Sequence, residues 1–189
     1  MILSYLGEGC FRLQSGDTSV LVNPTSNRLK GDAVLRTLVA TENPVVPGEF
    51  TFAGEYEIKG IEIQGFEVGE ESTDKYVKTI FAVDWEGTRF VFAGHLSHLP
   101  SEELTELIGE ADVLVVPTGE KHFLSVAEAA KLIKRLEPKV VVPAHYGPGK
   151  GNDLVKELGL TPEKEEKWVF KRKDLGEGKT RLLVLASTN

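Results

Sequence analysis

Histidines give the clearest chemical signal in this sequence, because three of the four stand where they could bind one metal ion together. His95 and His98 follow an apolar segment that ends at Ala93, and His145 follows one that ends at Pro143. Both segments are typical of strands, and ligands bind at the carboxyl ends of strands in open sheets. A His-x-x-His pair plus one distant histidine is sufficient for an open zinc site. Alternatively, these histidines bind no metal and instead form hydrogen bonds in the crevice or face solvent.

Other catalytic motifs are absent from the sequence. It has no Gly-x-Ser-x-Gly elbow, and the loop Gly147 to Gly151 lacks the spacing and the hydroxyl residue of a phosphate-binding loop. The carboxylates Glu49, Glu55 and Glu57 are explained by a strand pair with one solvated face. The single cysteine, Cys10, has apolar neighbours and is predicted to be a small core residue. No catalytic residue can be named from motifs alone.

The first half of the chain has the pattern of short strands separated by glycine turns. Turn residues at Gln14 to Asp17 and at Asp84 to Gly87 predict hairpins. The predicted strands are Ile2 to Leu6, Cys10 to Gln14, Ser19 to Val22, Glu55 to Ile58, Ile61 to Phe66, Thr79 to Trp85 and Arg89 to Ala93.

The second half alternates between strands and helices. Ser101 can cap a short helix, and the capping box that starts at Ser125 begins a longer helix that runs to about Leu136. This helix lies between two apolar strands, so a parallel βαβ unit is predicted. The remaining predicted elements are the strands Asp112 to Pro117 and Lys139 to Ala144, a helix from about Asn152 to Leu158, and a closing hairpin of Trp168 to Lys173 with Thr180 to Leu185.

Size and charge narrow the functional classes. A chain of 189 residues and 20.7 kDa has room for one well-buried core, so a single domain over residues 1–189 is expected. The net charge of −7 and the scattered basic residues argue against a nucleic-acid partner. No apolar stretch approaches the roughly 18 residues that would span a membrane. The segment from Met1 to Leu6 lacks a basic leader, so a soluble, cytoplasmic protein is expected.

Six phrases, in order, resemble those of the small zinc-dependent hydrolases of the metallo-β-lactamase superfamily, near the ascorbate-6-phosphate-lactonase-like branch. The resemblance runs from end to end of the chain. It implies an α/β fold, an αββα sandwich of two mixed β-sheets, with metals held at one edge between the sheets. The matching phrases are Tyr5 to Phe11 with "YLGHSCF", Val20 to Pro24 with "ILIDP", Pro47 to Phe50 and Gly54 to Ile61 with "GPGEYEVGGI", Gly94 to His98 with "GDLGH", Val116 to Gly119 with "PVGG", and Val142 to Tyr146 with "IPMHY".

The family's HxHxDH motif, however, is missing. It should follow Asp32 to Thr37, where the chain instead has the segment Leu38 to Asn43. By position, Leu38 and Ala40 replace two ligands of the first metal, and neither side chain has a lone pair to donate. Glu42 and Asn43 stand where an aspartate and a histidine would bind the second metal.

Three further positions depart from the family pattern. Glu8 replaces the histidine of the first phrase, and Asn23 replaces the aspartate of the second. His95 stands at the bridging aspartate, and an imidazole does not normally bridge two ions as a carboxylate does. The resemblance therefore implies a degenerate member without a dinuclear site.

Two functions remain open. The first is a pseudoenzyme without dinuclear-metal hydrolase activity or cofactor, which uses its crevice or surface to bind a small molecule or to assemble, for instance as a homodimer. The alternative is a mononuclear hydrolase of an ester, lactone or phosphoester, with one zinc ion held by His95, His98 and His145. The other candidate crevice residues are Glu8, Asn23, Glu42, Asn43, Thr118 and His122.

Overall fold

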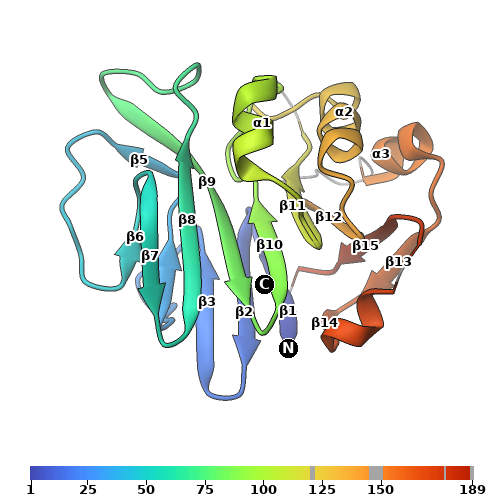
Figure 1. Cartoon of the computed structure of the whole chain (residues 1–189), viewed down its shortest axis with the longest axis horizontal. Coiled ribbons are helices and arrows are strands. Elements are labelled where there is room, and N and C mark those ends of the chain that lie inside the picture. The colour runs from blue at the N-terminus through green and yellow to red at the C-terminus, as the bar shows by residue number, and fades with distance from the viewer. Residues whose placement is uncertain (120–121, 145–150, 177, 188–189) are drawn as a thin grey trace.

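The computed structural model describes residues 1–119, 122–144, 151–176 and 178–187. Two β-sheets pack face to face, and the helices lie against one of them (Figure 1). The space between the sheets is filled by apolar side chains from both, including Leu13, Val22, Phe81 and Phe92, each at most 1% exposed. The predicted sandwich of two mixed sheets is therefore confirmed.

The first sheet has six strands and comes mainly from the start of the chain. Its first three strands in sequence form an antiparallel meander, in which Ser15 pairs with Thr18 across the predicted turn. The next two strands are added in parallel, which makes the sheet mixed. Its order is β14 (Lys167–Val169), β1 (Ile2–Gly7), β2 (Cys10–Ser15), β3 (Thr18–Val22), β4 (Ala33–Leu35) and β6 (Glu49–Phe50).

The second sheet has nine strands. The strands β12, β11 and β10 pair in parallel, whereas β10, β9 and β8 pair antiparallel. The short strand β5 (Leu38–Ala40) pairs only with the start of β9. The order is β13 (Pro162–Glu165), β15 (Arg181–Leu185), β12 (Val140–Ala144), β11 (Val113–Pro117), β10 (Thr88–Phe92), β9 (Tyr76–Trp85), β8 (Ile61–Glu67) and β7 (Gly54–Ile58).

Helices cover the outer face of the nine-stranded sheet (Figure 1). They are α1 (Glu102–Ile108), α2 (Val126–Leu136) and α3 (Gly151–Leu158), and a short 3-10 helix, η1, spans Arg172–Leu175. Ser101 caps α1, and Ser125 with Glu128 forms the predicted capping box of α2. Every residue of β11 and β12 is buried because helices cover one face and the other sheet covers the second. The predicted βαβ unit is confirmed, because β11 and β12 pair in parallel.

The predicted closing hairpin is wrong. β14 pairs with β1 in the six-stranded sheet, whereas β15 pairs with β12 in the other sheet. Trp168 and Phe170 stack with ring centroids 3.8 Å apart and are buried between the sheets, together with Leu175. Because these side chains are buried between the sheets, the chain crosses from one sheet to the other between β14 and β15 and does not form a hairpin. Among the described residues, no helix is long and apolar enough to cross a membrane.

A close contact between two residues fixes the turn that follows β10. Gly94 turns the chain just after β10 with a φ of +57°, a left-handed conformation that glycine adopts at little cost. Thr37, which immediately precedes β5, packs against it, so that a Cβ added at Gly94 would overlap the Thr37 side chain. The loop that carries His95 and His98 begins at this junction.

We expect Gly94→Ala to lower the free energy of unfolding by about 2–5 kcal/mol, because left-handed strain and overlap with Thr37 add together. Gly16→Ala is the matched control, since its φ is +56° and no atom lies within 4 Å of the added Cβ. It should cost only the strain, about 1–2 kcal/mol. Urea unfolding of both variants measures the difference, and equal losses would contradict the proposed contact.

Candidate functional site

A pocket of about 490 Å³ lies where β5 and β9 meet the loops that follow β10 and β11. Residues far apart in the sequence meet here because the chain repeatedly returns to the same end of the nine-stranded sheet. The residues that line the pocket are Leu38, Glu71, Tyr76, Lys78, His95, Ser97, His98, His122 and Phe123.

A buried ion pair joins Glu71, in the loop between β8 and β9, to Lys78 on β9. Lys78 Nζ lies 2.5 Å from Glu71 Oε2 and also donates to Ser97 Oγ at 3.0 Å. Glu71 further accepts hydrogen bonds from the Ser97 hydroxyl, from the Ser97 amide at 3.0 Å and from the His98 amide at 2.9 Å. The Glu71 side chain is 6% exposed and that of Lys78 is 17% exposed. The network holds the loop after β10 against the loop before β9.

Two opposing effects set the pKa of Glu71. Burial alone would raise it, but hydrogen bonds from Lys78, from the Ser97 hydroxyl and from the two amides outweigh burial and hold the pKa below its ordinary value. The carboxylate therefore stabilises the folded state above its ordinary pKa. This contribution is lost as the pH falls through the lowered pKa.

Lys78 stands directly across the strand pair from Leu38. The two residues are Cα partners in the antiparallel ladder of β5 and β9, so their side chains project from the same face. Both line the pocket. An ammonium group and an isobutyl group therefore occupy the side of the pocket where the family resemblance leads one to expect a histidine ligand at position 38.

A second polar chain runs from His95 to Thr37 and Asn23. His95 Nδ1 lies 2.7 Å from Thr37 Oγ1, and the two groups of the Asn23 amide bond to Thr37 on its hydroxyl and its backbone nitrogen, both at 2.9 Å. Burial of the ring, followed by the positive charge of Lys78, lowers the pKa of His95 from 6.5 to about 4. His95 is therefore neutral at pH 7.

Three of the candidate residues from the sequence line this pocket. His95, His98 and His122 all do so, and Asn23 is joined to His95 through Thr37. The His98 side chain is 78% exposed, and its Nδ1 lies 4.0 Å from Glu71 Oε1. His145 lies outside the described residues.

The remaining candidates lie elsewhere in the described part of the chain. Glu8 is exposed in the turn between β1 and β2, and Glu42 is exposed after β5. Asn43 donates a hydrogen bond to the Pro44 carbonyl, and Thr118 is buried at the end of β11. None of these side chains is among those that line the pocket.

The described residues do not form a metal site. No group of three or more His, Cys, Asp and Glu side chains converges on one point in residues 1–119, 122–144, 151–176 and 178–187. Glu71, the one carboxylate among the described residues that line this pocket, is already bonded to Lys78 and to amides. Among the described lining residues, the histidines therefore have no carboxylate beside them that is free of other partners, and the proposed ligand His145 lies outside the described part of the chain.

Sequence reasoning missed Glu71, Lys78 and Thr37. The predicted strand begins at Thr79, one residue after Lys78. Glu71 lies in a loop rich in Gly and Glu, which is typical of a solvated turn. One signal is present: Lys78 lies between the buried residues Val77 and Thr79, just before the apolar run Ile80 to Val83. Its partners come from other parts of the chain, and no local pattern predicts them.

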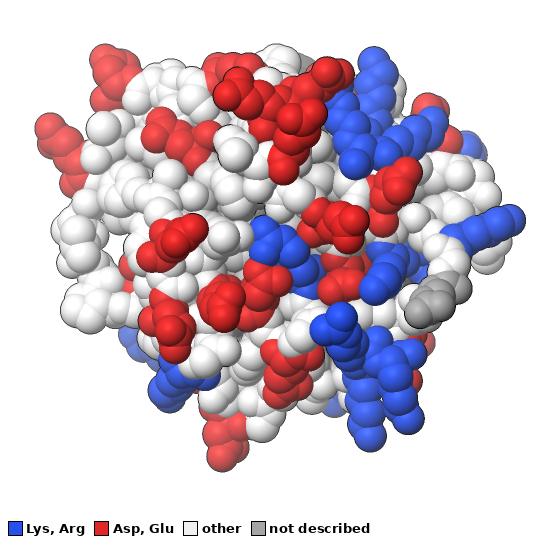
Figure 2. Space-filling view, viewed as in Figure 1, with Lys and Arg blue, Asp and Glu red and all other residues white. Residues whose placement is uncertain are grey.

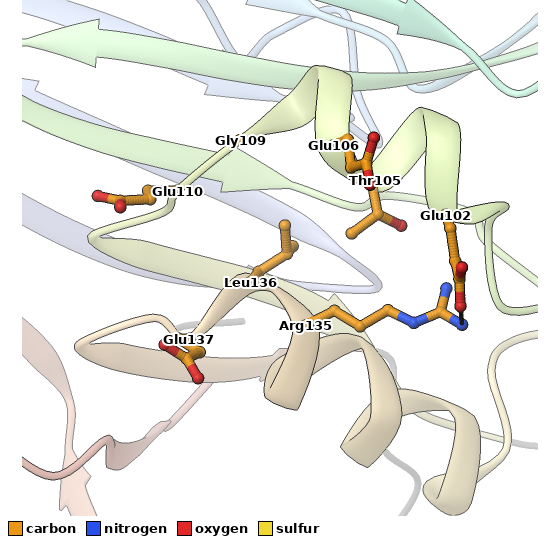
Figure 3. Close-up of a pocket in the computed structure, with 8 residues that line it drawn as sticks. All are labelled: Glu102, Thr105, Glu106, Gly109, Glu110, Arg135, Leu136 and Glu137. Carbon is orange, nitrogen blue, oxygen red and sulfur yellow. Dashed lines mark hydrogen bonds and ion pairs between the residues drawn. The ribbon is translucent and has the colours of Figure 1, made fainter.

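A second hollow, of about 450 Å³, lies between α1 and α2 (Figure 3). Its wall carries Glu102, Glu106, Glu110 and Glu137, and Arg135 lies 3.4 Å from Glu102 across it. Its described lining residues include no histidine, serine or cysteine. On the face shown in Figure 2, acidic side chains are widely spread, and basic ones gather in groups mainly toward the right, with acidic side chains between the groups. The pocket with the histidines is therefore the better functional candidate.

Lys78→Met should lower the free energy of unfolding by about 3–5 kcal/mol, because it leaves the Glu71 charge buried without its partner. The double variant Glu71→Gln with Lys78→Met removes both charges and should recover most of this loss. Chemical denaturation of the three proteins at pH 7 is the measurement. A double variant no more stable than Lys78→Met would contradict the buried pair.

The stability should also depend on His95 between pH 4 and 6.5. In this range the unfolded imidazole binds a proton and the folded one does not, so stability falls as the pH decreases, by up to about 3 kcal/mol. His95→Asn retains a group near Nδ1 that can bond to Thr37 but does not titrate. We expect its pH dependence to be flatter by that amount in denaturation curves, and parallel curves would rule out a neutral buried His95.

Comparison with known proteins places the chain in a family. Residues 2–145 match the model of the beta-lactamase superfamily domain. A UPF0173 protein of Pyrococcus furiosus is 29% identical over 133 residues, which are 70% of this chain but only 60% of that protein. A UPF0173 metal-dependent hydrolase of Natranaerobius thermophilus is 21% identical over 185 residues, covering 77% of this chain and 83% of that protein.

Solved structures agree on the fold. A Thermotoga maritima protein of the metallo-β-lactamase superfamily superposes with a TM-score of 0.79 at 22% identity, over 98% of this chain and 99% of that one. Igni18, a metallo hydrolase of Ignicoccus hospitalis, superposes with a TM-score of 0.66 at 20% identity, over 96% and 94% of the two chains. The family model covers well over half of the sequence, and the two-sheet architecture matches, so this chain belongs to the beta-lactamase superfamily domain family.

Proposed function

We propose that this chain is a member of its family without dinuclear-metal hydrolase activity, and that it binds a small molecule in the pocket without a metal ion. The observation that carries the proposal is the position of Lys78, opposite Leu38 and bonded to Glu71. The Natranaerobius thermophilus relative is named a metal-dependent hydrolase, but the pocket of this chain carries the ammonium group of Lys78 and the alkyl group of Leu38 on the β5–β9 strand pair.

Electrostatics support the proposal. A divalent cation and an ammonium group about 4 Å apart repel each other by roughly 8 kcal/mol at an effective dielectric constant of 20. This figure is for the ammonium group alone, and the Glu71 carboxylate, 2.5 Å from Lys78 Nζ, offsets part of it. The charge of Lys78 acts across the pocket, since it contributes to the lowered pKa of His95. A divalent ion beside His95 would therefore meet a cation and no free carboxylate among the described lining residues.

Metal analysis tests the proposal. Protein expressed with added zinc, manganese and iron, and then dialysed, should hold far less than one metal ion per chain by mass spectrometry. Added zinc should leave the melting temperature of the wild type unchanged, whereas a ligand at about 100 times its Kd adds roughly 2.7 kcal/mol of stability. Purified protein should also fail to hydrolyse ester, lactone and phosphoester substrates.

The competing function is the mononuclear zinc hydrolase built on His95, His98 and His145. It predicts about one retained ion per chain, together with a zinc-dependent shift in melting temperature that is lost in a His95→Ala, His145→Ala double variant. That pair of results would contradict the metal-independent proposal.

A further inference from the structure

We infer that the pocket binds a small organic monocarboxylate, whose carboxylate accepts a hydrogen bond from Lys78 and whose apolar group lies against Leu38, Tyr76 and Phe123. This inference rests on the proposed function, because it assigns a ligand class to the same metal-free pocket. Three observations support it: Lys78 has an N–H group without an acceptor among the described residues, the Glu71 carboxylate is already hydrogen bonded, and part of the pocket lining is apolar.

The Lys78 ammonium has more hydrogen-bond donors than the protein uses. A lysine ammonium has three N–H groups and no acceptor. In Lys78, these groups reach two acceptors, Glu71 Oε2 and Ser97 Oγ. No third acceptor lies within bonding distance among the described residues, and Lys78 lines the pocket. One N–H therefore remains for a ligand.

The two charges of the ion pair differ in how much they are exposed. The Glu71 carboxylate is covered by Lys78, by the Ser97 hydroxyl and by the amides of Ser97 and His98, and only 6% of its side chain is exposed. Lys78 is about three times as exposed, at 17%. Both side chains line the pocket, but the carboxylate is the less exposed of the two and its oxygens already accept hydrogen bonds from four groups, which favours an anionic ligand over a cation.

The apolar side chains of the pocket wall limit the shape of the ligand. Leu38 is 37% exposed and Tyr76 is 54% exposed, so both present apolar surface that a ligand could cover. Phe123 adds a ring whose centroid lies 6.1 Å from that of His95. A single available ammonium donor matches one carboxylate better than a phosphate dianion, which usually needs several donors. A ligand with one carboxylate and a compact apolar group can contact both the Lys78 ammonium and the apolar side chains.

Calorimetric titration tests the inference with benzoate, its neutral analogue benzamide and inorganic phosphate, in buffer stripped of metals on a chelating resin. Benzoate should bind the wild type with a Kd of about 1 mM or below. Benzamide and phosphate should bind at least about 10-fold more weakly, because neither combines a carboxylate with an apolar ring.

Variants separate a role of Lys78 from a general effect on folding. Glu71→Gln with Lys78→Met should weaken benzoate binding by at least about 10-fold while keeping the fold free of an unpaired buried charge. Glu71→Gln alone keeps the ammonium and should bind benzoate at least as tightly as the wild type. Lys75→Met, at an exposed lysine just before β9, is the matched control and should bind as the wild type does.

Three results would overturn the inference: equal affinity for benzoate and benzamide, unchanged benzoate binding in the double variant, or no saturable benzoate binding by the folded wild type. Metal analysis distinguishes the two proposals. If the protein holds no metal and benzoate does not bind, only the ligand class is wrong. If benzoate binds only after zinc is added, the metal-independent function is wrong as well.

Discussion

The buried ion pair of Glu71 and Lys78 is the interaction on which the arrangement of the pocket depends. A carboxylate that is 6% exposed must be paired and hydrogen bonded, because an isolated buried charge is costly. Glu71 meets this requirement by binding Lys78 on β9 and the amides of Ser97 and His98 after β10. These contacts fix the loop that carries His95, and they place a positive charge beside a ring that burial already keeps neutral.

Much of the fold follows from patterns that are local in the sequence. Alternating burial along β1 and unbroken apolar runs in β11 and β12 are what a half-buried and a fully buried strand require. The turns and the capping box of Ser125 are local in the same way. The closing hairpin failed because the partners of β14 and β15 lie in different sheets, and burial of Trp168 and Phe170 decides that choice.

The site was predictable only in part, for the same reason. Strand ends placed His95, His98 and His122 near one pocket, and the departure from the family motif drew attention to Leu38. The ion pair in the pocket joins Glu71 of a loop to Lys78 near the start of β9. The pairing of β5 with β9 places Lys78 opposite Leu38. No periodicity or motif in the sequence encodes that pairing.

We propose that the ammonium of Lys78 occupies the charged position of the pocket in place of a metal ion. A crystal structure of protein grown and soaked with zinc, with diffraction data collected at the zinc absorption edge, tests it most directly. We expect no anomalous peak in the pocket, and we expect Lys78 to be still bonded to Glu71. A peak coordinated by His95, with Lys78 displaced from Glu71, would contradict it.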